Sequence, residues 1–151
     1  SITSAGKDMF HRILVVCHGN ICRSPVAEVM LRRCLPNKEV QSAGIGALVD
    51  HVADPSAAKL ATNDGLDLTT HKARQLDYEM IQWADLVLVM TERQRSAISE
   101  LAPTAMGKTF LLGHWLQKEI PDPYKKSQEV FQHVHQLIQQ AANAWQEKIA
   151  E

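Results

Sequence analysis

Short apolar runs alternate with longer amphipathic stretches along this chain. The run Ile-Leu-Val-Val at 13–16 is rich in β-branched residues and apolar on both faces. The run Asp-Leu-Val-Leu-Val-Met at 85–90 is the second clear run of this kind. Such runs are typical of strands covered on both faces in a parallel sheet. Weaker patterns predict two further strands at 39–43 and 108–112.

Between these runs, apolar residues recur at helical spacing and are bounded by residues that commonly begin or end helices. Ser24 is a candidate N-cap followed by proline, and Thr91 with Gln94 has the spacing of a capping box. The predicted helices cover about 24–35, 55–64, 77–83, 91–101 and 127 to near the C-terminus. Alternating strands and helices predict an open, doubly wound α/β sheet of about four parallel strands with helices on both faces.

Length and composition indicate one globular domain. With 151 residues and 45% hydrophobic residues, the chain can bury one sizeable core. We assign residues 9–151 to it and expect residues 1–8, which are small and polar, to be an N-terminal addition outside the fold. No stretch approaches the roughly 20 apolar residues of a membrane span, so no stable membrane insertion is expected. Sixteen basic against seventeen acidic residues give no general attraction for nucleic acid.

The cysteines and histidines argue for a reducing compartment and against a metal site. Three cysteines are an odd count and a poor basis for a disulfide-stapled scaffold, so a cytoplasmic location is expected. Cys34 lies at core spacing and is interpreted as a small buried side chain. His133 and His135 fall on opposite sides of the last predicted helix, so no zinc site is expected.

The segment after the first predicted strand carries the candidate chemistry. Cys17 is separated by five residues from Arg23, and a helix is predicted to follow. Backbone N–H groups, a helix N-terminus and a guanidinium group together stabilise a thiolate and form a cradle for a phosphate group. The predicted phosphate-binding residues of this loop are His18, Gly19, Asn20, Ile21 and Cys22.

Ser24 has two possible roles, which are compatible with each other. Its hydroxyl lies one residue after Arg23, where it could donate to the Cys17 thiolate and stabilise it as a leaving group. Alternatively, Ser24 acts only as the N-cap of the following helix.

The stretch from Cys17 to Pro25, Cys-His-Gly-Asn-Ile-Cys-Arg-Ser-Pro, resembles the signature of the low molecular weight protein tyrosine phosphatases. The resemblance covers about residues 10–147 and includes Pro121-Asp122-Pro123-Tyr124. It implies that Cys17 forms a phosphocysteine intermediate, that Arg23 stabilises the transferring phosphoryl group, and that Asp122 is the general acid. Phosphotyrosine would be the substrate. No cofactor is expected, because the cradle supplies the positive charge.

The residues at the mouth of the implied site resemble one branch of this family. Tyr124 is expected to stack on the phenyl ring of phosphotyrosine. Familiar animal members carry a tryptophan and a second aromatic residue where this chain has Leu48 and Lys125. The difference resembles the bacterial branch associated with exopolysaccharide and capsule production. It implies a mostly monomeric enzyme whose partner is an autophosphorylating bacterial tyrosine kinase with a tyrosine-rich tail.

Two further features follow from the resemblance. A reversible disulfide between Cys17 and Cys22 would shield the nucleophile from over-oxidation, and the sequence leaves open whether it forms. His71 resembles a position that helps to hold Asn20, although a histidine on the surface near a turn fits the sequence equally well. Trp115 is interpreted as a packing residue that lies in the loop approaching Asp122.

Three rival functions fit the sequence less well. A thiol-dependent arsenate reductase shares the fold and the cradle but needs two further cysteines as a relay, and none follows Cys34. A module that only binds phosphotyrosine could dispense with Cys17 and Asp122, and both are present. A purely structural role would leave the cradle, the arginine and the acid unexplained.

Overall fold

A computed structural model describes residues 10–150. The expectation for residues 1–8 therefore lies outside the described residues. The strands are β1 (Arg12–Cys17), β2 (Glu39–Gly44), β3 (Leu86–Val89) and β4 (Thr109–Leu111). The α-helices are α2 (Arg23–Cys34), α3 (Pro55–Asn63), α4 (Tyr78–Trp83), α5 (Glu92–Leu101) and α6 (Gln128–Ile149), and two short 3₁₀ helices are η1 (Pro103–Lys108) and η2 (His114–Leu116).

The four strands form one parallel sheet in the order β2-β1-β3-β4. β1 lies inside the sheet, with Ile13 paired to Val40 on one side and to Leu86 on the other. All five residues from Ile13 to Cys17 are buried, as expected for a strand covered on both faces. The predicted doubly wound α/β architecture is confirmed.

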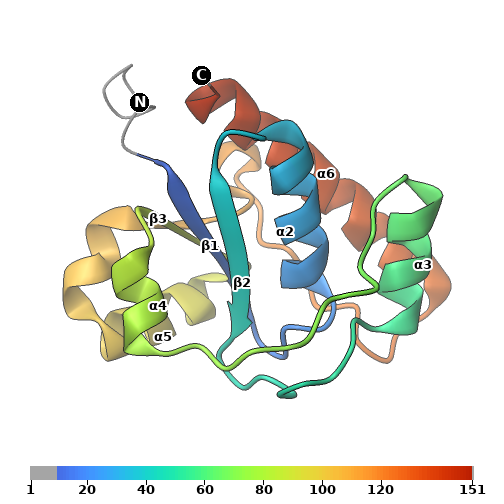
Figure 1. Cartoon of the computed structure of the whole chain (residues 1–151), viewed down its shortest axis with the longest axis horizontal. Coiled ribbons are helices and arrows are strands. Elements are labelled where there is room, and N and C mark those ends of the chain that lie inside the picture. Colours follow the sequence, from blue (N-terminus) through green and yellow to red (C-terminus); the bar gives the residue numbers. More distant parts are fainter. Residues whose placement is uncertain (1–9, 151) are drawn as a thin grey trace.

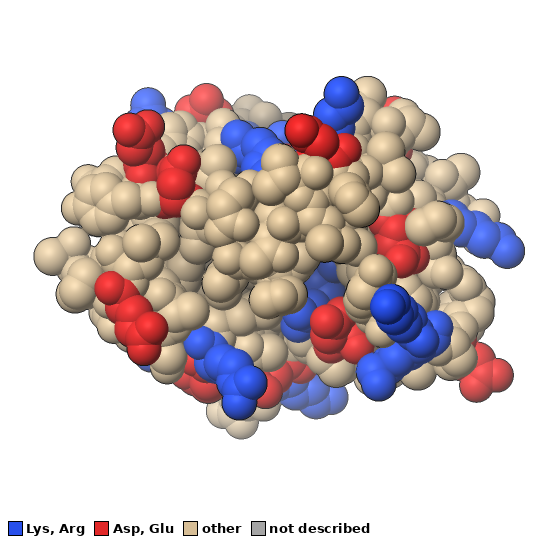
Figure 2. Space-filling model, turned by 90° about the horizontal axis from the view of Figure 1, so that it is seen from below, with Lys and Arg blue, Asp and Glu red and all other residues tan. Residues whose placement is uncertain are grey.

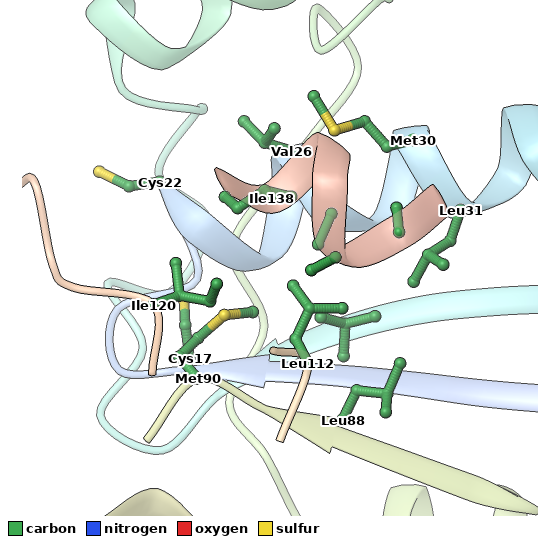
Figure 3. Close-up of a cluster of buried hydrophobic side chains, with 14 of the residues drawn as sticks. Cys17, Cys22, Val26, Met30, Leu31, Leu88, Met90, Leu112, Ile120 and Ile138 are labelled. Atoms are coloured by element: carbon green, nitrogen blue, oxygen red, sulfur yellow. The ribbon is translucent and has the colours of Figure 1, made fainter. Parts of the chain in front are cut away.

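Helices cover both faces of the sheet (Figure 1). α2, α3 and α6 lie on one face, where they pack against alternate strand residues such as Ile13, Val15 and Leu88. α4 and α5 lie on the other face, over the intervening strand residues such as Leu14 and Val87. Figure 3 shows the first core, in which α2 and α6 meet the sheet through Val26, Met30, Leu31, Leu88, Leu112 and Ile138.

Most predicted helix boundaries agree with the structure to within a few residues. Asp54, Asp77 and Ser127 cap α3, α4 and α6 through their side chains. The capping box predicted for α5 is only half formed. Thr91 Oγ1 accepts a hydrogen bond from the Gln94 amide N–H, but Gln94 Oε1 accepts from the N–H of Met90 instead of returning to Thr91.

The carboxyl ends of the strands all point toward the lower edge of Figure 1, where α2 begins directly after β1. The long connection between β4 and α6 also reaches this edge, and it is closed at its start by a hydrogen bond from the Lys118 N–H to the Gly113 carbonyl. Trp115 in this connection packs edge-on against Trp145 of α6, which agrees with a packing role. Among the described residues, no helix combines the length and apolar character needed to cross a membrane.

Candidate active site

A cavity of about 250 Å³ opens at the carboxyl end of β1. Its wall is formed by the loop that joins β1 to α2, by the loop after β2 and by the connection before α6. The lining residues are Cys17, His18, Gly19, Ile21, Cys22, Arg23, Gly46, Leu48, Asp122 and Tyr124. Nine of these ten were predicted as site residues from the sequence, and Gly46 was missed. The remaining two predicted residues, Asn20 and Ser24, do not line the cavity.

Cys17 is the last residue of β1 and its side chain is buried. Its sulfur lies 2.9 Å from the hydroxyl oxygen of Ser24 and 3.3 Å from the backbone nitrogen of Asn20, whose N–H donates to it. The thiol group therefore meets hydrogen-bond donors before any substrate is bound.

Ser24 does not cap α2. The helix begins at Arg23 with Cys22 in the N-cap position, and no side chain makes the cap hydrogen bond. Ser24 lies inside the first turn, and its hydroxyl is directed to Cys17. The carboxamide Nδ2 of Asn20 donates to Ser24 Oγ at 2.8 Å, and the Ser24 O–H is available to donate to Cys17 Sγ when sulfur is a thiolate.

Asn20 connects the loop to residues far away in the sequence. It is fully buried and has a φ of 58°, in the left-handed region that asparagine tolerates. Nδ2 also donates to Ser42 Oγ at 3.0 Å, and Oδ1 accepts from the Arg74 N–H at 2.9 Å. Its main-chain oxygen lies 2.6 Å from His71 Nε2. All polar atoms of its side chain are satisfied, which fixes the curl of the loop.

His71 thus lies where the resemblance implied, in contact with Asn20. Ser42, which accepts from Asn20, extends the hydrogen-bond network to α2, because its hydroxyl donates to Glu28 Oε1 at 2.7 Å. The participation of Ser42, Glu28 and Arg74 was not foreseen. These residues come from separate elements, and no spacing in the sequence marks them as neighbours.

Arg23 is buried, with only 4% of its surface exposed, and its guanidinium group reaches the connection before α6. Nη1 donates to the main-chain oxygen of Ile120 at 2.8 Å, and Nη2 lies 3.8 Å from Asp122 Oδ2. The Asp122 carboxylate is half exposed, whereas Ile120 is fully buried. Arg23 therefore joins the phosphate cradle to the segment that carries the candidate acid.

Cys22 also faces the cavity. Burial raises the pKa of the Cys22 thiol strongly, and the nearby Asp54, Cys17 and Asp122 raise it further. Cys22 therefore remains a neutral thiol at physiological pH. All three cysteines of the chain lie within the described residues and are free thiols in this structure. Cys34 is half-buried, and its thiol donates to the Met30 carbonyl at 3.0 Å.

The mouth of the cavity is apolar on the side of the loop after β2. Leu48 is 37% exposed and its N–H donates to the Gly19 carbonyl, and Tyr124, which is 41% exposed, also lines the cavity. Lys125 Nζ lies 5.5 Å from the centre of the Tyr124 ring. Figure 2, which views this end of the molecule from below, shows a largely uncharged centre with acidic and basic side chains around it.

Two glycines allow the loop after β2 to approach the cradle. A Cβ atom on Gly44, the residue paired with Cys17, would lie 2.5 Å from the His18 carbonyl oxygen. A Cβ atom on Gly46 would lie 2.9 Å from the His18 ring. In the part of the chain that the structure describes, no group of three or more potential metal-binding side chains is found.

Comparison with known proteins agrees with this geometry. Residues 12–151 match the family model "Low molecular weight phosphotyrosine protein phosphatase". The chain is 47% identical to the low molecular weight protein-tyrosine-phosphatase Etp of Escherichia coli K12 over 142 residues, covering 93% of this chain and 96% of Etp.

Solved structures give the same result. The crystal structure of the tyrosine phosphatase Wzb from Escherichia coli K30 in complex with sulphate has a TM-score of 0.91 and 51% identity, covering 93% of this chain and 99% of Wzb. Vibrio vulnificus Wzb in complex with benzylphosphonate has a TM-score of 0.90 and 46% identity, covering 92% of this chain and 99% of the Vibrio chain. The chain belongs to the low molecular weight protein-tyrosine-phosphatase family, in the exopolysaccharide-associated bacterial branch that its sequence predicted, and is a protein-tyrosine-phosphatase.

Proposed function

We propose that this phosphatase hydrolyses phosphotyrosine through a phosphocysteine intermediate, with Cys17 as nucleophile, Arg23 and the loop 18–22 as the phosphate cradle, and Asp122 as the general acid. One observation carries this proposal: the Cys17 side chain, the Arg23 guanidinium group and the Asp122 carboxylate line one cavity. The cavity thus contains a nucleophile, an anion-binding group and a proton donor together.

In the first step, the Cys17 thiolate attacks phosphorus and forms the S–P bond while the P–O bond to the phenyl ring breaks. Asp122 gives its proton to the departing phenolate oxygen, which is a poor leaving group without it. Arg23 and the backbone N–H groups stabilise the charge on the three equatorial oxygens. The guanidinium group is already fixed by Ile120, so little reorganisation is required.

In the second step, the Asp122 carboxylate takes a proton from water, and the resulting hydroxide attacks phosphorus. The S–P bond breaks, and sulfur leaves as thiolate with the Ser24 hydroxyl donating to it. Inorganic phosphate is released and Asp122 is again protonated. The cradle supplies the positive charge that a metal ion would otherwise provide, so the proposed reaction uses no cofactor.

The shape of the mouth supports an aryl phosphate substrate. Tyr124 and Leu48 offer an aromatic and an aliphatic wall to a phenyl ring held above Cys17. Benzylphosphonate, whose phenyl ring is joined to phosphorus through one methylene group, is the ligand named for the Vibrio vulnificus relative. We propose that the partner is a phosphotyrosine tail of a bacterial tyrosine kinase that controls exopolysaccharide or capsule production, and that the enzyme acts in the cytoplasm, mostly as a monomer.

The test compares wild type, Cys17→Ser and Asp122→Ala, each with EDTA present. Hydrolysis of p-nitrophenyl phosphate should be abolished in Cys17→Ser, while phosphate still binds. Asp122→Ala should lose the most activity toward the more basic leaving groups. Phosphotyrosine peptides should be hydrolysed in preference to phosphoserine peptides.

Measurable turnover by Cys17→Ser would refute the covalent mechanism, and equal losses for all leaving groups would remove Asp122 as the acid. No turnover by reduced wild-type protein would instead favour a module that only binds phosphotyrosine. Arsenate reduction by the same preparation would favour the reductase.

A further inference from the structure

The segment that carries Asp122 is held at two buried points. Ile120 is fully buried; its N–H donates to the Met90 carbonyl at 2.9 Å and its carbonyl accepts from Arg23. Pro123 is also buried, against a pocket wall that includes Cys22 and Phe131. Asp122 therefore lies on a short exposed span between two anchors, not at the tip of a freely moving loop. Any contact that fixes this span also fixes the acid.

Glu119, next to the first anchor, makes such a contact. Its Oε2 accepts a hydrogen bond of 2.8 Å from the main-chain N–H of Glu92, the first residue of α5. This N–H belongs to the first turn of the helix, where the amide groups lack a partner within the helix. A carboxylate is also favoured there by the helix dipole. Glu119 is exposed, so water could solvate its carboxylate if the contact with Glu92 were absent.

The contact links α5 to the catalytic groups over a short path. Glu119 is bonded to Ile120, Ile120 accepts from Arg23, and Arg23 lies 3.8 Å from Asp122. Resting on the proposed role of Asp122, we infer that Glu119 is a positioning residue for the general acid: by tying the connection to the N-terminus of α5, it sets the distance between Asp122 and the leaving-group oxygen.

The experiment uses Glu119→Ala and Glu119→Gln. Values of kcat/KM are measured for phenyl phosphate, whose leaving group needs a proton, and for p-nitrophenyl phosphate, whose leaving group does so much less. Glu119→Ala should lower kcat/KM for phenyl phosphate by about 3–10-fold, a fraction of the ~10²–10⁴-fold that a general acid supplies. The loss for p-nitrophenyl phosphate should be smaller. Glu119→Gln keeps an acceptor oxygen and should restore most of the activity.

Thr91→Ala is the matched control. It removes Thr91 Oγ1, the side-chain acceptor for the Gln94 N–H at the same end of α5. This acceptor makes its hydrogen bond within α5 and not with the segment that carries Asp122. It should therefore destabilise the helix start without changing the dependence on leaving group. If Thr91→Ala reproduces the Glu119→Ala profile, the effect comes from the helix alone and the inference fails.

A double variant separates this inference from the proposed function. If Glu119 acts through Asp122, adding Glu119→Ala to Asp122→Ala should cause no further loss. A multiplicative loss in the double variant, or equal losses for the two substrates in Glu119→Ala, would overturn the inference. If Asp122→Ala loses the same factor in kcat/KM for all leaving groups, the proposed role of Asp122 as general acid is refuted. The inference about Glu119 is then refuted as well.

Discussion

The hydroxyl oxygen of Ser24 lies 2.9 Å from the sulfur of Cys17 and accepts a hydrogen bond from the Asn20 carboxamide on its other side. The Asn20 carboxamide occupies one acceptor site of the hydroxyl, and a thiolate at Cys17 can only accept, so the Ser24 proton donates to sulfur in that state. Sulfur bears the most negative charge as free thiolate, after it has left phosphorus. The contact is therefore most favourable at the end of the second chemical step.

We predict that Ser24→Ala slows breakdown of the phosphoenzyme more than its formation. Hydrogen bonds to charged groups contribute about 1.5–3 kcal/mol, so kcat should fall about 10–100-fold. The burst of nitrophenol before the steady state should become more pronounced. Ser42→Ala, which removes the other hydroxyl contact of Asn20 but none with sulfur, should cost less. An unchanged kcat, or the same loss in both variants, would contradict the assignment of Ser24.

The two glycines beside His18 should respond differently to alanine. At Gly44 the new methyl group would meet the main-chain oxygen of His18, which cannot move without opening the cradle. We expect Gly44→Ala to lower the free energy of unfolding by about 1–3 kcal/mol and to reduce phosphate affinity. At Gly46 the methyl group meets the His18 ring, which can rotate away, so Gly46→Ala should be mild. Urea denaturation and phosphate inhibition constants measure both effects, and equal penalties at the two positions would contradict the argument.

Cys22 should make the fold sensitive to alkaline pH. Its pKa in the folded protein is raised above the ordinary value of 9.0, so above that pH the unfolded chain releases this proton while the folded protein keeps it. The stabilisation is complete below pH 9.0 and is lost as pH rises further, by at most about 1.4 kcal/mol per pH unit. Urea titrations of reduced wild type and Cys22→Ala between about pH 8 and about pH 10 measure this. The stability difference between them should stay nearly constant up to about pH 9 and fall above it. A difference that stays constant over the whole range would show that Cys22 does not titrate this way.

Features encoded by neighbouring residues could be predicted from the sequence. The strand at 13–16 and the spacing of Cys17 and Arg23 are local patterns, and they located both the sheet and the cradle. Asp122 was found only because the family resemblance connects it to a cysteine loop far away in the chain. In the structure its Oδ2 lies 3.8 Å from Arg23 Nη2.

Features that depend on long-range packing were missed or misassigned. Ser24 has the residue type and the proline of an N-cap, but the first turn of α2 starts at Arg23 and turns the hydroxyl toward Cys17. Gln94 has the capping-box spacing, yet its side chain meets the end of β3 at Met90. The Ile120 carbonyl that holds Arg23 is a main-chain atom, and its position cannot be read from residue identity.

The position of β1 inside the sheet also determines when the enzyme can be completed during synthesis. β1 leaves the ribosome before its partner β3, which follows about 70 residues later, with Ile13 paired to Leu86. Contacts of such sequence separation form late, because a long loop must close first. The Cys17 loop remains without the Ile120 carbonyl until a further 34 residues have emerged beyond Leu86. In a nascent chain the Arg23 guanidinium group therefore lacks this partner until the segment around Ile120 has been made.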